Sequence, residues 1–167
     1  MTVEALTPSK AASHIIKWMR AYLGGDVPLV TDLDLVRKML PSTPYGKGVK
    51  EIKAPMPATW SGCEGALVRN PVDVSEWGIF YNPDARLERR RFTVAHELGH
   101  FVLHRDSNDA FNCNKAAVYS GSDTLAVIER EANVFASNLL MPGDVFGKAI
   151  NGSRIDLRFM SDLANKF

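Results

Sequence analysis

Three histidines and a glutamate interrupt an otherwise apolar segment, RRFTVAHELGHFVLH, at residues 90–104. Polar side chains in a half-buried helix are costly unless a partner satisfies them. On a helix, the four-residue spacing of His96 and His100 places both imidazoles on one face, about 6 Å apart along the axis. Two imidazoles so placed can bind one Zn²⁺, so the HExxH pattern predicts a metal ion as the partner.

Glu97 is the expected general base. It is rotated by about 100° around the helix axis from His96, so we expect its carboxylate to touch a water at the metal and not the metal itself. Zn²⁺ lowers the pKa of such a water towards ~7, and a nearby carboxylate can then take the proton at neutral pH. The proton would pass on to the leaving amine.

His104 extends the histidine series by one more turn. On a continuous helix it lies about 12 Å from His96 along the axis, which is too far to share a metal. The bent motif HExxHxxGxxH needs a glycine turn that this segment lacks. Two roles stay open for His104: a cap on the last carbonyls of the helix, or a catalytic contact to the transition state at the edge of the cleft.

The third metal ligand is expected on AVIEREANVFASNLLMP, residues 126–142. Glu131 falls within an apolar helical stripe, and an ionised carboxylate is rarely buried without a partner. Glu129 is two residues away and points to a different face, so Glu131 is preferred. Cys113 and Asp123 are further candidates that could swing in from the preceding polar segment. The stripe also contains Val127, Val134, Phe135, Asn138 and Leu139.

The elements that must position these side chains are predicted from hydrophobic periodicity and from helix breakers. Helices are expected at 9–23, 31–40, 85–103 and 124–140, followed by one or two short helices. WGIFYN, at 77–82, is the clearest strand in a proline-rich stretch of strands and turns. The polar segment 105–123 is predicted to be a mobile surface loop that could act as a lid. We divide the chain into N-terminal helices (1–40), a strand-rich region (41–83), the HExxH and carboxylate-ligand helices (84–142) and a helical tail (143–167).

Length, charge and cysteine content restrict the class of protein. A chain of 167 residues is expected to form one domain, 1–167, whose core needs no structural metal. Twenty Lys and Arg against nineteen Asp and Glu leave a net charge of +1, so neither nucleic acid nor an anionic membrane is an expected partner. Two isolated cysteines, an N-terminus unlike a secretory signal, and the lack of an apolar run of ~18 residues favour the cytoplasm.

The segments RRRFTVAHELGHFVLH and EREANVFASNLLMP resemble the ImmA/IrrE family of metallopeptidases. That family repeats the pattern RxRFTxAHELGHxxLH and, further along, ExxANxFA or EANxFAxxLLMP. The resemblance covers residues 76–142 and implies an α+β, zincin-like core of the gluzincin type, with a small mixed sheet packed on helices. It maps the metal ligands to His96, His100 and Glu131, and the catalytic glutamate to Glu97.

The resemblance also implies a substrate. Members of the family typically cleave a helix-turn-helix repressor encoded beside them, which relieves the repression of mobile-element, prophage or stress genes. An edge strand would hold the extended peptide beside the metal, and WGIFYN or a neighbouring strand is expected there. The first 60 residues show no helix-turn-helix pattern, which indicates a stand-alone protease, and the tail looks shorter than in many relatives.

Other functions fit parts of the same sequence. The chain could hold a repressor or a toxin without cutting it, or it could hydrolyse a small-molecule amide. Mn²⁺ or Fe²⁺ could replace Zn²⁺, since each accepts two imidazoles and a carboxylate. A cluster of arginines could bind nucleic acid, but at the start of the HExxH helix these side chains are expected to cover packed surface or pair with acids. The cluster consists of Arg86, Arg89, Arg90 and Arg91.

Overall fold

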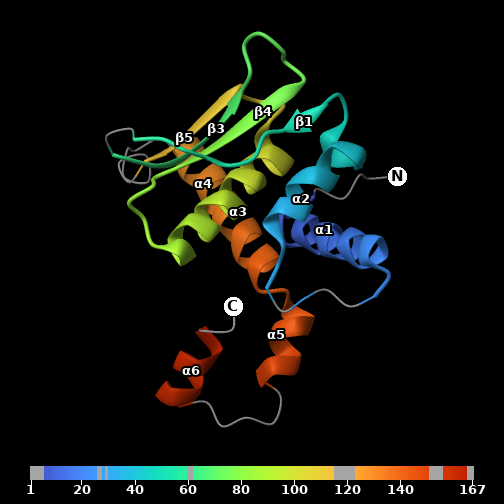
Figure 1. The fold of residues 1–167 in the computed structure, drawn as a ribbon, viewed down its shortest axis with the longest axis vertical. Helices are drawn as coiled ribbons and strands as arrows, with labels where there is room; N and C mark the ends of the chain where they lie inside the picture. Colours follow the sequence, from blue (N-terminus) through green and yellow to red (C-terminus); the bar gives the residue numbers. More distant parts are fainter. Residues whose placement is uncertain are drawn as a thin grey trace.

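The structure is a computed structural model that describes residues 6–25, 28, 30–59, 62–114, 123–150 and 156–164. It is a mixed α+β fold with a small mixed sheet, as expected. Figure 1 shows the strands in one layer, with α3 and α4 on one face of the sheet and α1 and α2 beside them. In chain order the elements are α1 (Pro8–Leu23), α2 (Leu33–Met39), the 3-10 helices η1 (Leu40–Ser42) and η2 (Pro44–Gly46), β1 (Glu51–Ile52), β2 (Met56–Pro57), β3 (Cys63–Arg69), β4 (Glu76–Tyr81), α3 (Leu87–His104), β5 (Ala110–Asn114), α4 (Asp123–Leu140), α5 (Gly143–Ile150) and α6 (Leu157–Ala164).

The sheet has the order β1-β4-β3-β5, and the short β2 also pairs with β4. β3 runs antiparallel to both β4 and β5, whereas β1 and β2 run parallel to β4. β4, which contains most of the WGIFYN segment, is therefore paired on both sides and does not lie at the sheet edge, so of the two predicted alternatives only a neighbouring strand remains. Alternate residues of β4, Trp77 and Ile79, are fully buried, which is why its apolar pattern is typical of an inner strand.

β5 is the strand that lies at the sheet edge on the other side of β3. It falls inside the segment 105–123 that the sequence predicts to be a surface loop, so that prediction is wrong for residues 110–114. The segment is polar, but Phe111 is buried and supplies the apolar contact that anchors the strand. Residues 115–122 lie outside the described part of the chain.

The core forms where α3 is enclosed between the sheet and α4. Trp77 of β4 meets Phe101 of α3 edge to face, with ring centroids 5.8 Å apart. On the other side of α3, Gly99 allows α4 to approach closely, because a side-chain carbon at residue 99 would lie 3.2 Å from the backbone of Ala132. The HExxH segment is therefore buried on both sides, as its apolar flanks predict.

The N-terminal helices complete this packing. α1 is capped by the Thr7 side chain and ends at Gly24, whose φ of 70° is left-handed. Between α1 and α2, the Thr31 hydroxyl donates a buried 2.7 Å hydrogen bond to the carbonyl of Leu139 in α4. Among the described helices, none is both long and apolar enough to cross a bilayer.

Candidate metal centre

His96 and His100 lie one turn apart on α3, and their Nε2 atoms are 3.0 Å from each other. Both side chains are buried, His100 completely. Phe111 of β5 stacks on the His100 ring at a centroid separation of 4.7 Å and an interplanar angle of 13°. The helix and the edge strand together hold the two imidazoles in the paired arrangement that their spacing predicts.

The carboxylate beside this pair belongs to Glu129 of α4. Its oxygens lie 3.2 Å from His96 Nε2 and 3.4 Å from His100 Nε2. Glu131 instead points to His104, and 43% of its side chain is exposed against 13% for Glu129. The structure therefore brings Glu129, and not the expected Glu131, to the imidazole pair.

The correction has a packing cause. The buried stripe of α4 contains Ala132, Phe135, Ala136 and Leu139, whereas the larger residues Val127 and Val134 are more than one-third exposed. The large apolar residues therefore indicate a buried face of α4 that is rotated from the face that is buried in the structure. Two signals pointed to Glu129: the small residues that mark the close approach to α3, and the pattern ExxANxFA, whose first Glu aligns with Glu129.

Asn133 was not predicted as part of the site. Its Oδ1 lies 3.0 Å from Nδ1 of His96, one turn beyond Glu129 on the same face of α4. An amide oxygen accepts a hydrogen bond, so the His96 proton is at Nδ1 and the Nε2 lone pair faces His100 and Glu129.

The ligand atoms of His96, His100 and Glu129 all lie within 4.8 Å of one another. Two imidazoles and a carboxylate are the donor set of catalytic zinc sites, which keep a further position open for substrate. The residues present therefore fit a metal ion of this kind. Among the described side chains, no Cys or Asp joins this group, and the side chains of Cys113 and Asp123 lie outside the described part of the structure.

The electrostatics of the site suit a cation. Burial lowers the pKa of His100 from 6.5 to about 4, so the ring is neutral at pH 7. Burial raises the pKa of the Glu129 carboxyl, but the neighbouring imidazoles of His100 and His96 outweigh that effect and lower it from 4.5 to about 2. A neutral imidazole and an ionised carboxylate are the protonation states that bind a metal.

Glu97 is fully buried beneath the sheet, next to Gly65 of β3. A side-chain carbon at residue 65 would lie 2.8 Å from Oε1 of Glu97 and 2.3 Å from Cγ2 of Thr93. The glycine thus leaves the space in which the Glu97 carboxylate meets the strand. Nothing in the sequence pattern alone singles out this glycine.

His104 does not join the group of candidate ligands. Its Nδ1 lies 3.2 Å from Nδ1 of His100, and its Nε2 lies 2.9 Å from Oε2 of Glu131. Both ring nitrogens therefore face side chains and not helix carbonyls, so the predicted cap is not what is observed, while the catalytic contact to the transition state stays a prediction.

Three of the four clustered arginines contact protein groups. Arg89 pairs with Glu64 at 3.4 Å, and Arg90 donates to the carbonyl of Ala85 at 2.7 Å. Arg91 donates to the carbonyl of Thr31 at 3.0 Å. These contacts tie the start of α3 to β3 and to the linker before α2, which is the packing role that the sequence favours.

Two histidines of an HExxH helix and a carboxylate from a second helix are the arrangement typical of the HExxH metal-dependent hydrolases. Residues 63–167 match the model of a peptidase family that is described as the IrrE N-terminal-like domain, and the chain belongs to this family. The resemblance seen in the sequence is confirmed.

Three relatives are similar over about half of this chain. The radiation response metalloprotease IrrE of Deinococcus radiodurans is 36% identical over 88 residues, which is 53% of this chain and 26% of that protein. IrrE of Deinococcus deserti is 33% identical over 88 residues, 53% of this chain and 31% of that protein. The metallopeptidase ImmA of Bacillus subtilis is 35% identical over 91 residues, 53% of this chain and 48% of that protein. The matches thus span less than half of each relative.

Proposed function

We propose that this chain is a zinc-dependent, site-specific endopeptidase with a zincin-like core of the gluzincin type. His96, His100 and Glu129 would hold the ion, and Glu97 would be the general base. The observation that carries the proposal is the Glu129 carboxylate, 3.2 and 3.4 Å from the two imidazole Nε2 atoms. The names of the relatives, metalloprotease and metallopeptidase, support the same reaction class.

A bound Zn²⁺ would supply Lewis-acid chemistry, polarising the scissile carbonyl and acidifying a water. The protein's own part is to hold and move protons. Asn133 keeps the His96 proton on Nδ1, away from the site. Glu97 accepts the proton of the attacking water and delivers it to the amine that leaves when the peptide bond breaks. Its complete burial keeps the carboxylate in a region of low dielectric, where proton transfer is not shared with bulk solvent.

The edge strand β5 is the proposed docking place for an extended substrate. Its residue Phe111 contacts His100, so a peptide paired with β5 would pass beside the candidate ligands. We propose a helix-turn-helix repressor encoded nearby as the substrate, on the family resemblance. Because such a repressor acts on cellular DNA, this proposal places the reaction in the cytoplasm, with derepression of mobile-element, prophage or stress genes as its result.

The test is a cleavage assay with the zinc-loaded protein and the helix-turn-helix repressor encoded beside its gene, with fragments identified by mass spectrometry. The Glu97→Gln variant is the control, because it keeps the candidate ligands and loses the base. We expect one discrete cut by the unaltered protein and a rate 10²- to 10⁴-fold lower for the variant. A repressor bound by both proteins and cut by neither would overturn the proposal in favour of a regulator that only binds.

A further inference from the structure

The proposed reaction leaves His104 and Glu131 without a role. His104 is buried at the end of α3, and Glu131 reaches it from α4 with its side chain partly exposed. The two side chains are 2.9 Å apart, and His104 is 3.2 Å from His100 on its other side. A line of hydrogen bonds therefore runs from a surface carboxylate to a candidate metal ligand.

The proton positions along this line follow from the chemistry of its first member. An ionised carboxylate only accepts hydrogen bonds, so Nε2 of His104 carries the proton that Glu131 receives. Nδ1 of His104 is then a lone pair that can accept a hydrogen bond. When a metal ion is bound at Nε2 of His100, the proton of His100 is on Nδ1, which donates across 3.2 Å to this lone pair.

This hydrogen bond favours the metal-binding tautomer of His100. With the proton on Nδ1, a neutral His100 has a lone pair on Nε2, the atom that lies 3.4 Å from Glu129 and 3.0 Å from His96. Phe111 stacks on the same ring and limits its rotation. The tautomer and the ring plane of His100 are thus held from outside the site.

We infer that Glu131 and His104 form a positioning pair that holds His100 in the tautomer whose Nε2 lone pair faces the metal site. The inference rests on the proposed metal centre and adds two residues that act on it without touching the metal. The His96 ligand has a different outer partner, the neutral Asn133. Loss of such a partner typically lowers metal affinity 10- to 100-fold.

The direct test reads the tautomers in the Zn²⁺-loaded, ¹⁵N-labelled protein by two-bond ¹H–¹⁵N correlation spectra of the imidazole rings. We expect the proton of His100 on Nδ1 and that of His104 on Nε2, and a mixture of tautomers for His104 in Glu131→Ala. A wild-type His104 with its proton on Nδ1 would overturn the inference. This measurement needs no activity, and its wild-type arm does not depend on whether a variant folds.

The second test measures Zn²⁺ affinity by competition with a chromogenic chelator. We expect Glu131→Ala to bind about 10- to 100-fold more weakly than the unaltered protein, and Glu129→Gln to lose more than that. Glu88→Ala, an exposed glutamate at the start of the same helix as the histidines, is the matched control and should bind normally. Equal affinities of Glu131→Ala and the unaltered protein would overturn the inference while leaving the metal centre intact. An unaltered protein that binds no Zn²⁺ would overturn the proposed function, and the inference with it.

Discussion

At the scale of single residues, the candidate metal centre depends on which ring nitrogen carries the proton in His96 and in His100. The Nε2 atoms of His96 and His100 are 3.0 Å apart and face one carboxylate, so a cation is the natural partner of this group. Each imidazole has a separate outer contact at Nδ1, Asn133 for His96 and His104 for His100. The orientation of the two imidazoles therefore depends on side chains that are not themselves candidate ligands.

Asn133→Ala should lower Zn²⁺ affinity about tenfold or more, because His96 loses the acceptor that keeps its proton on Nδ1. Asn133→Asp keeps an acceptor and should retain most of the affinity. Asn138→Ala is the matched control: Asn138 lies on the same helix and donates to the carbonyl of Val134, not to the site. Chelator competition gives the three affinities, and an Asn133→Ala protein that binds like Asn138→Ala would contradict the role of Asn133.

The sequence was sufficient to predict which part of α3 carries the chemistry, because a four-residue spacing on a helix leaves little freedom. The hydrophobic pattern alone was not sufficient to choose between Glu129 and Glu131, which lie on different faces of α4. The choice depends on how α4 rotates against α3, and that rotation follows from Gly99 and Ala132, whose small size gives a weak signal in a hydrophobic pattern.

At the scale of elements, the position of Glu97 depends on strand β3. Gly65→Ala should lower the cleavage rate about 100-fold, because a misplacement of about 1 Å has effects of this size and the new methyl group would lie 2.8 Å from Oε1 of Glu97. Zn²⁺ affinity should change much less, since the imidazoles keep their contacts. Gly147→Ala in α5, where an added carbon meets nothing within 4 Å, is the matched control. An unchanged rate for Gly65→Ala would mean that Glu97 does not need this space.

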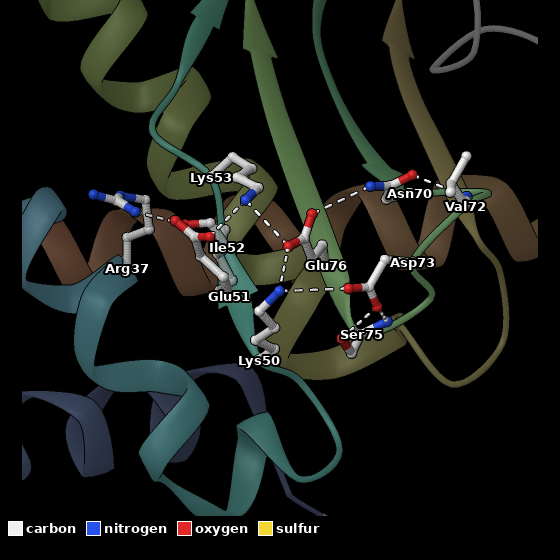
Figure 2. Close-up of polar contacts among 10 residues, drawn as sticks. All are labelled: Arg37, Lys50, Glu51, Ile52, Lys53, Asn70, Val72, Asp73, Ser75 and Glu76. Carbon is white, nitrogen blue, oxygen red and sulfur yellow. Dashed lines mark hydrogen bonds and ion pairs between the residues drawn. The ribbon is translucent and has the colours of Figure 1, made fainter.

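A second prediction concerns the start of β4, beside the edge strand β1, where Glu76 contacts two lysines (Figure 2). Lys50 Nζ and Lys53 Nζ lie 3.0 and 3.2 Å from its Oε1. The hydrogen bond from Lys50, with that from Lys53, lowers the pKa of the Glu76 carboxyl below its usual 4.5. A carboxyl with a lowered pKa in the folded state stabilises the protein above the unfolded pKa, and this contribution disappears as the pH falls through the folded pKa.

Glu76→Gln should therefore lower the free energy of unfolding at pH 7, and the difference from the unaltered protein should shrink as the pH falls below about 4.5. Urea unfolding of the metal-free proteins at several pH values measures it, with Glu88→Gln as the control carboxylate. A difference that stays constant down to pH 3 would show that the ionised form of Glu76 is not what the lysines stabilise.

The strands also show what an apolar pattern can and cannot predict. Alternation in WGIFYN correctly indicates a strand, but its burial on both edges follows from pairing with β1 and β3, which no local pattern encodes. β5 was read as a loop because one buried residue, Phe111, carries its apolar contact in an otherwise polar segment. Pairing across the sheet overrides local composition in both cases.

At the scale of the whole molecule, the metal site joins elements that are distant in the chain. His96 and His100 come from α3, Glu129 comes from α4, and Phe111 on the edge strand packs against His100. A ligand that binds only the folded state stabilises it by mass action. At free Zn²⁺ about 1,000 times its dissociation constant, the gain is about 4 kcal/mol, which for a chain of this size raises Tm by about 8–16 °C.

Thermal unfolding followed by circular dichroism, with and without Zn²⁺, measures this shift. Glu129→Gln should show little of it, while its Tm without metal should stay close to that of the unaltered protein. Equal shifts in both proteins would mean that Zn²⁺ binds elsewhere on the chain.

The position of the metal ion itself tests most directly whether His96, His100 and Glu129 form a metal centre. Diffraction from crystals grown with Zn²⁺, measured on both sides of the zinc absorption edge, locates the ion without reference to activity. We expect one anomalous peak, bounded by Nε2 of His96, Nε2 of His100 and a carboxylate oxygen of Glu129, with Glu131 turned to His104. A peak coordinated by Glu131, or none beside the histidine pair, would contradict it.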